Sequence, residues 1–220
     1  MIEIEGVLKE LSGKRPIFHS EADFQHALAW TIHEKYPDLN IRLEKRVVLN
    51  NNNKKIYFDI FAFNENKTVI VIIEVKYKTK ELKLDDDAVV NNEKFDLKNQ
   101  GAQDQGRYDF INDISRLEKA LEIYGGTGFA ILLTNDESYW KTPTRDVDAV
   151  DEALRIHEKS IICGKLSWKE ETSNGTKSGR NGIILKGNYT LDWKDYSNIK
   201  GQENGEFRYL LVKIAHNNSV

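Results

Sequence analysis

The sequence has little cysteine and no long apolar run. Its one cysteine, Cys163, excludes a disulfide framework and a cysteine-rich zinc site, and it fits a reducing compartment. No apolar stretch approaches the ~18 residues that a membrane-spanning helix needs. The first eleven residues lack the apolar core of a signal peptide. We therefore expect a cytoplasmic protein with no membrane partner.

A surplus of positive charge is also missing. The 220 residues include 32 Lys and Arg against 35 Asp and Glu, a formal net charge of -3. Proteins that coat nucleic acid through bulk charge are strongly basic, so this class is excluded, and any nucleic-acid contact must come from a local patch. Hydrophobic residues make up 40% of the chain, which is enough for a core and excludes wholesale disorder.

Only three prolines are present, and none interrupts a strongly periodic segment. Three segments have the apolar periodicity of helices: Ser20–Lys35, Gln105–Tyr124 and Val147–Lys159. Ser20 is a good N-cap for the first helix, and Gly125 and Gly126 end the second. Four segments are rich in apolar and β-branched residues and are predicted to be strands: Ile41–Leu49, Ile56–Phe63, Thr68–Tyr77 and Gly128–Thr134.

The order of these elements predicts the fold class. The nearly continuous β-branched run at 68–77 is typical of a central strand covered on both faces. A strand, a long helix and a further strand predict a right-handed crossover between parallel strands. We expect an α/β fold over residues 1–160, in which helices flank a mixed central sheet, with a β-rich extension of the same domain over residues 161–220. The sequence leaves open whether this extension joins the main sheet or forms a small second lobe.

Two carboxyl residues lie within apolar strands and are predicted to converge. Alternation gives each acid apolar neighbours on its own face: Ile70 and Ile72 for Glu74, and Tyr57, Phe61 and Phe63 for Asp59. If the turn at 64–67 sets Phe63 opposite Thr68, Asp59 is a diagonal neighbour of Glu74, ~7–8 Å away between backbones. A slip of one residue would place the two acids on opposite faces.

The expected surroundings of these acids point to a metal ion. Charged groups among apolar residues are unfavourable unless they are paired or bind a cation, and close carboxylates raise one another's pKa. Oxygen ligands of this kind suit Mg²⁺ or Mn²⁺, which keep several waters. Lys76 follows Glu74 on the same face. There it could orient or deprotonate a water and offset charge that develops on a phosphate.

Asp59 followed by Glu74-Val75-Lys76 resembles the motif of the PD-(D/E)XK nuclease superfamily, which has a restriction-endonuclease-like fold. The expected order of elements from about residue 20 to residue 134 is similar to the core of that fold. One departure is Phe58, which stands where the family's nominal pattern has proline. The resemblance implies metal-dependent hydrolysis of phosphodiester bonds, in DNA more often than in RNA.

The resemblance also implies roles for individual residues. Asp59 would be a bridging metal ligand, Glu74 a second ligand and Lys76 the group that activates water. Many members add an acid from the first helix, and Glu21 matches it here, as a supporting ligand or a holder of water. The implied cofactor is Mg²⁺ or Mn²⁺.

Three further residues are candidates for binding nucleic acid. Lys78 belongs to a basic run that could grip a phosphate backbone, or that protects an edge strand from aggregation. Gln105 and Arg107 begin the second long helix, where Arg107 could clamp a phosphate or take part in ordinary helix-terminal contacts.

Two alternative functions stay open. The fold could be a catalytically inactive module that binds nucleic acid or a protein partner, with the acids as residues of a retired site. It could also be a hydrolase of a small phosphorylated molecule. Cleavage of both strands of a duplex needs two active sites, so a homodimer is a further expectation.

Overall fold

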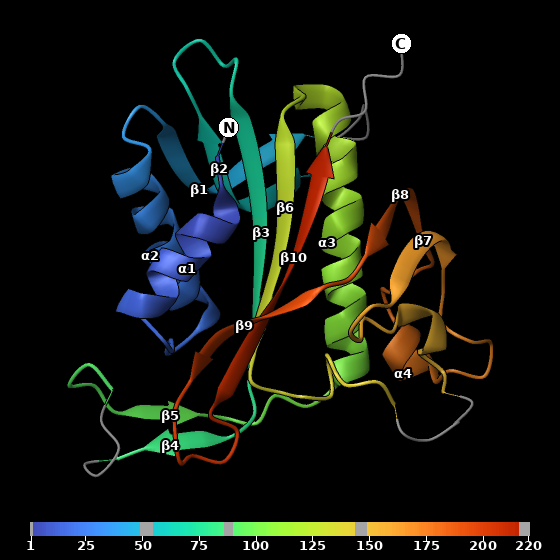
Figure 1. The fold of residues 1–220 in the computed structure, drawn as a ribbon. Coiled ribbons are helices and arrows are strands. Elements are labelled where there is room, and N and C mark those ends of the chain that lie inside the picture. The colour runs from blue at the N-terminus through green and yellow to red at the C-terminus, as the bar shows by residue number, and fades with distance from the viewer. Residues whose placement is uncertain (1, 49–54, 86–89, 144–148, 216–220) are drawn as a thin grey trace.

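The computed structural model describes residues 2–48, 55–85, 90–143 and 149–215. Its centre is a six-stranded mixed sheet with helices on both faces, which confirms the predicted class (Figure 1). The strands lie in the order β1 (Asn40–Val48), β2 (Lys55–Phe63), β3 (Ile70–Lys78), β6 (Thr127–Thr134), β10 (Glu206–Ala215) and β9 (Trp193–Asn198). β3 and β6 are parallel, and the other neighbouring strands are antiparallel.

Helices cover the two faces of this sheet unequally. α1 (Ile4–Lys14) and α2 (Glu21–Lys35) pack on one face, and the long α3 (Gln103–Tyr124) packs on the other. Smaller elements lie outside the sheet: the ribbon of β4 (Leu82–Leu84) and β5 (Phe95–Leu97), the hairpin of β7 (Ile161–Leu166) and β8 (Ile183–Thr190), and the short α4 (Asn174–Lys177). No helix within the described ranges is long and apolar enough to cross a membrane.

The alternation of β3 divides the interior into two cores. Ile73 and Val75 belong to the core under α1 and α2, whereas Ile72 belongs to the core under α3. Phe110 and Ile114 of α3 are fully buried in that second core. Each such side chain contributes about 1.5–3 kcal/mol through burial of apolar surface. Glu74 and Lys76 lie on the α3 side of β3, as the sequence predicts.

The predicted crossover is confirmed, because α3 connects the parallel strands β3 and β6 through a glycine turn. Gly126 has a φ of +88°, and a Cβ on it would lie 2.3 Å from the carbonyl oxygen of Ile70. The side chain of any other residue would therefore collide with the backbone of Ile70, the first residue of β3.

The helices differ from the prediction in two places: one predicted helix does not form, and one observed helix is not predicted. Within residues 149–159 the predicted third helix is wrong, and its start at 147–148 lies outside the described residues. Only a 3₁₀ turn, Glu152–Leu154, forms, because nearby backbone groups bond other segments: Val150 O accepts from Lys169, and the Glu158 amide donates to Trp140. Conversely α1 was not predicted, although its buried residues recur at helical spacing: Ile4, Val7, Leu8 and Leu11.

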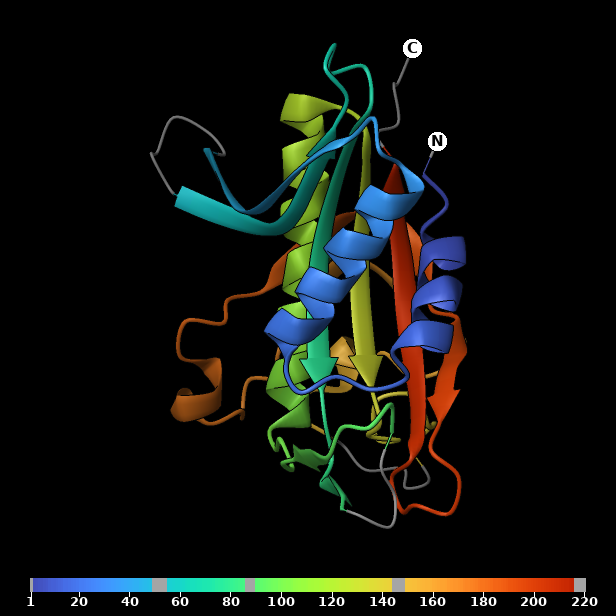
Figure 2. The same ribbon diagram turned by 90° about the vertical axis from the view of Figure 1, so that its left-hand side faces the viewer.

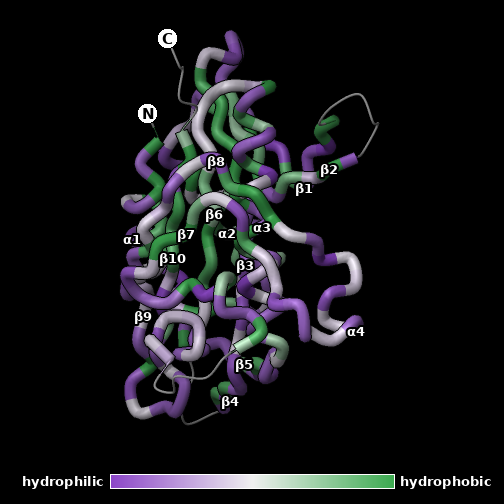
Figure 3. Tube along the Cα trace, turned by 90° about the vertical axis from the view of Figure 1, so that its right-hand side faces the viewer, coloured by the Kyte–Doolittle hydropathy of each residue, from purple (hydrophilic) through white to green (hydrophobic). Residues whose placement is uncertain are grey.

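Both arrangements considered for the C-terminal segment occur. β9 and β10 join the main sheet, whereas β7 and β8 form a separate hairpin. That hairpin region and the far part of the β1–β2 hairpin project to the same side of the sheet, the side of α3 (Figures 2 and 3). The α3 face is therefore flanked by two projections, and the α1–α2 face is not.

Candidate active site

The site forms where β2 leaves β3. The two strands pair only from Ile60 opposite Ile73 to Phe63 opposite Ile70. Beyond this fork the amides of β3 lose their partners on β2, and two carboxylates replace them. Asp59 Oδ2 accepts from the Val75 amide at 2.7 Å. Glu21 Oε2 accepts from the Tyr77 amide at 2.8 Å. Because buried amides need acceptors, the fork draws both acids to the edge of β3.

The register differs from the prediction by two residues. Phe63 pairs with Ile70 and not with Thr68, because a longer turn closes on Asn64, whose side-chain oxygen accepts from the Val69 amide at 3.0 Å. A shift of two residues preserves the face of every side chain. Continuing the register by one pair places Asp59 directly opposite Glu74, and no longer on its diagonal.

The predicted alternation of β2 fails at Asp59. Phe58 and Phe61 both pack in the core under α3, although strict alternation would put them on opposite faces. On the neighbouring strand, Glu44 has a left-handed φ of 50°. Gln25 of α2 spans this distortion: its Nε2 donates to Asp59 O at 2.7 Å and to Glu44 Oε1 at 3.0 Å. At Asp59, therefore, β2 twists so that the side chains before it change face. We call this twist the roll of β2, and Gln25 of α2 hydrogen-bonds the strand at that residue.

Glu74 is a buried acid beside a second acid. Its side chain is 2% exposed, and Arg116 Nη2 lies 3.0 Å from its Oε1. Burial and the neighbouring Asp113 carboxylate raise the pKa of Glu74 to about 10, against the opposing charge of Arg116. Arg116 also bonds Asp113 Oδ1 at 2.9 Å, so one guanidinium serves two carboxylates. Burial likewise raises the pKa of Asp59, although the Val75 amide opposes the shift.

Lys76 forms an ion pair with Asp113, the residue of α3 that also bonds Arg116. Its Nζ lies 2.9 Å from Asp113 Oδ2. Burial opposes the charge on Lys76, but Asp113, Glu21 and Asp59 together raise its pKa above the usual value. An ammonium stabilised in this way stays protonated. Of the two roles predicted for Lys76, the electrostatics favour orientation of a water or phosphate over removal of a proton.

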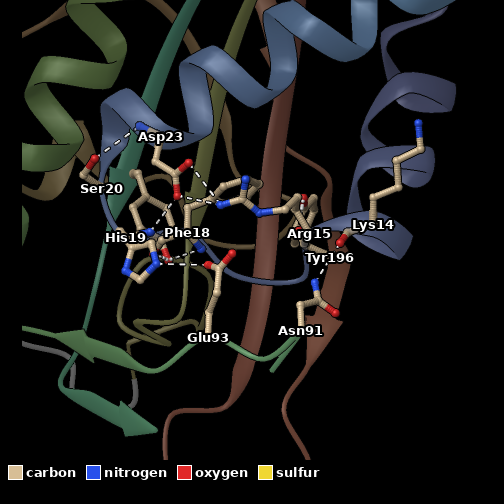
Figure 4. Close-up of polar contacts among 10 residues, drawn as sticks. Lys14, Arg15, Phe18, His19, Ser20, Asp23, Asn91, Glu93 and Tyr196 are labelled. Carbon is tan, nitrogen blue, oxygen red and sulfur yellow. Dashed lines mark hydrogen bonds and ion pairs between the residues drawn. The ribbon is translucent and has the colours of Figure 1, made fainter. Parts of the chain in front are cut away.

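Polar contacts anchor the start of α2 (Figure 4), the helix whose first residue is Glu21. Ser20 caps the helix by accepting from the Asp23 amide at 3.2 Å. Arg15 bonds both oxygens of Asp23, at 3.1 and 2.9 Å, and the His19 amide donates to the same carboxylate. His19 Nε2 contacts Glu93 at 3.1 Å. Burial raises the pKa of Glu21, and Lys76 opposes this shift.

We call the group of Glu21, Asp59, Glu74, Lys76, Asp113 and Arg116 the charged cluster. If all six were ionised, four negative charges would face two positive charges, an excess of two. Such an excess in a buried place matches a divalent cation, and adjacent Asp59 and Glu74 offer the oxygen atoms that Mg²⁺ prefers. No set of three or more His, Cys, Asp or Glu side chains in the described ranges is arranged to hold a metal. Of the acids in the cluster, Asp59 and Glu74 are the two that would hold such a cation, with waters or Glu21 completing its shell.

The three residues predicted to bind nucleic acid lie in different surroundings. Lys78 is half-buried at the end of β3, and Gln105 is half-buried in the first turn of α3. Arg107 is buried: its Nε lies 3.3 Å from Asp151 Oδ2. A guanidinium neutralised in the interior cannot clamp a phosphate, so we remove Arg107 from the candidates.

Sequence reasoning missed Asp113 and Arg116. The signal was present, because Asp113 lies three residues after Phe110 and four before Leu117, within the apolar stripe of α3. A buried carboxylate needs hydrogen-bond donors or a cation, and for Asp113 the cations are Lys76 and Arg116.

Residues 22–112 match a family model described as the N terminus of the Type I restriction enzyme R protein. The matched region is less than half of the chain. It includes Asp59, Glu74 and Lys76, begins one residue after Glu21, and ends one residue before Asp113. This region of the chain is thus similar to the N-terminal part of a restriction enzyme subunit. No curated protein and no solved structure matches the chain.

Proposed function

We propose that the chain is a divalent-metal-dependent nuclease of the PD-(D/E)XK type that hydrolyses phosphodiester bonds in DNA. The observation that carries the proposal is the charged cluster, in which Asp59, Glu74 and Lys76 lie together at the fork of two strands, with more carboxyl groups than cations around them. The match to a restriction enzyme subunit supports DNA as the substrate.

Each residue of the cluster has a role that follows from its contacts. Asp59 and Glu74 would hold Mg²⁺ or Mn²⁺, with Glu21 as a third ligand or a holder of a bound water. The cation supplies Lewis-acid polarisation of the phosphate and lowers the pKa of a bound water. Lys76, protonated and held by Asp113, orients the water and offsets negative charge on the transition state.

The first test is cleavage by the purified chain with Mg²⁺ or Mn²⁺. The substrates are supercoiled plasmid, linear duplex, single-stranded DNA and structured RNA. We expect Asp59→Asn, Glu74→Gln and Lys76→Met each to reduce the cleavage rate at least 100-fold, because each removes a group that acts on the reacting phosphate. Lys83→Met is the matched control, since Lys83 is exposed on β4, and the ion pair that it makes is with the surface residue Asp85. Cleavage that survives in the three site variants would contradict the proposal.

Thermal unfolding separates this function from an inactive module. A ligand that binds only the folded state raises its stability, by about 2.7 kcal/mol at a concentration 100-fold above Kd. We expect Mn²⁺ to raise the melting temperature of the wild type, and to have less effect on Asp59→Asn. If the wild type neither cleaves any substrate nor gains stability with Mg²⁺ or Mn²⁺, the chain is a binding module and the nuclease assignment fails.

A further inference from the structure

A polar groove lies beside the charged cluster, between α3 and the segment that leads into β8. Its volume is about 650 Å³. α3 contributes one wall with Asp109, Asn112 and Lys119, and the segment at 178–186 contributes the other with Arg180, Asn181 and Lys186. The groove is separate from the three residues predicted to bind nucleic acid.

The second wall is held rigidly against α3. The Tyr108 hydroxyl donates to Asn181 O at 2.8 Å, and the Tyr108 ring stacks on Trp168 with centroids 5.8 Å apart. About three turns further along α3, Glu118 accepts from the amides of Lys186 and Gly187 at 3.0 and 2.7 Å. The groove is therefore preorganised, and a ligand would not need to order its walls.

The wall of the groove that α3 contributes lies close to the site along the helix. Asp109 lies one helical turn before Asp113, the residue that pairs with Lys76. Burial raises the pKa of Asp109, and Arg180, Lys78 and Lys76 all oppose this shift. The groove and the charged cluster therefore lie within electrostatic reach of each other.

Positive groups outnumber negative ones along the groove. Three cations, Lys119, Arg180 and Lys186, line the groove with one carboxylate, that of Asp109, although the Lys186 ammonium also contacts Glu122 outside it. Arg180 Nε lies 3.7 Å from Asp109 Oδ1, and within the described residues this buried nitrogen has no hydrogen-bond acceptor. In a chain with a net charge of -3, this is the kind of local basic patch that nucleic-acid binding requires.

We propose that this groove binds the sugar-phosphate backbone of the nucleic acid and leads a strand to the charged cluster. Arg180 makes the principal phosphate contact, and Lys119 adds a second. The amides of Asn112 and Asn181 can donate to phosphate oxygens beside them. The proposal rests on the proposed function for its class of ligand, and DNA and RNA share the backbone chemistry that the groove would recognise.

The test is binding in EDTA, so that no substrate is cleaved. Fluorescence anisotropy would measure binding of labelled duplex DNA, single-stranded DNA and RNA at several salt concentrations. We expect Arg180→Gln combined with Lys119→Gln to weaken binding at least 10-fold, and to reduce the slope of log K against log salt by about 1 to 2. The nucleic acid that binds most tightly among duplex DNA, single-stranded DNA and RNA identifies the ligand of the groove.

The matched control combines Lys9→Gln with Lys200→Gln, two exposed lysines outside the groove that remove the same charge. The control should bind as the wild type does, and both double variants should keep the wild-type melting temperature. Equal binding by the groove variant and the wild type, equal losses in groove and control variants, or no binding by the wild type would overturn the proposal.

The outcomes also separate the groove from the nuclease. If the wild type cleaves but the groove variant binds normally, the groove proposal fails and the nuclease stands. If the groove variant loses binding but the wild type never cleaves with Mg²⁺ or Mn²⁺, the groove stands and the nuclease fails.

Discussion

Two buried carboxyl groups lie at α3, Glu118 on the helix itself and Glu74 on β3 beside it, and their surroundings differ. Glu118 of α3 accepts hydrogen bonds from two backbone amides of β8 and from the Tyr189 hydroxyl at 2.8 Å. Glu74 of β3 faces Arg116, but Asp113 and Asp59 lie beside it. Glu118 has hydrogen-bond donors for both of its carboxylate oxygens. Glu74 instead shares the guanidinium of Arg116 with the carboxylate of Asp113.

This difference is the one expected between an acid that stabilises the fold and an acid that holds a metal ion, as we propose for Glu74. Neutral donors that match a carboxylate make its burial favourable, and they anchor the β7–β8 hairpin to α3. Adjacent carboxylates do the opposite, because each penalises the charge of the other. A fold keeps such a group at a cost in stability, and a cation that binds there removes the cost.

The largest expected contrast is the response of the metal-free protein to pH. The pKa of Glu74 is about 10 in the folded state, and it is ~4.3 in an unfolded chain. Between these values the folded state holds a proton that the unfolded state releases, so stability falls as pH rises, by roughly 1 kcal/mol for each pH unit. The raised pKa values of Asp59 and Glu21 act in the same direction.

Urea denaturation in EDTA at pH 5.5 and pH 8.5 measures this fall. Glu74→Gln cannot titrate, so its urea midpoint should decline less between the two pH values than that of the wild type. An equal decline in both proteins would show that other groups cause it, and would contradict the description of Glu74 given above.

The second contrast is the loss of each carboxyl. Glu118→Ala would leave two amides and a hydroxyl without their acceptor, and we expect a loss of about 3 kcal/mol. Glu74→Gln keeps the size of the side chain and removes the proton that the folded wild type must take up at pH 7. Its free energy of unfolding at pH 7 should therefore equal or exceed that of the wild type. Chemical denaturation checks both values, and a greater loss in Glu74→Gln would reverse the comparison.

How far the sequence predicts this molecule depends on which residues interact locally. Ser20, the apolar spacing of α2 and α3, and the β-branched run of β3 predict these elements, because each signal lies within the element itself. The 3₁₀ turn at Glu152–Leu154 could not be predicted, because backbone partners distant in sequence override the local periodicity.

The candidate site divides in the same way. Alternation along β3 correctly places Glu74 and Lys76 on one face. The register of Phe63 depends on the geometry of a turn, and the roll of β2 at Asp59 depends on Gln25, which lies 34 residues away in the chain. Neither is encoded in the periodicity of the strands themselves.

The smallest expected effect concerns Gln25, which positions Asp59 without entering the cluster. Gln25→Leu removes the donor to the Asp59 carbonyl, so the roll of β2 loosens and the carboxylate is less well oriented. We expect cleavage at saturating substrate to fall about 10-fold, equivalent to about 1.4 kcal/mol. Thr31→Val is the control on the same helix, since it removes a hydrogen bond to Ala27 O that is remote from the site. If Thr31→Val slows cleavage as much as Gln25→Leu, the effect is general destabilisation of α2, and Gln25 has no positioning role.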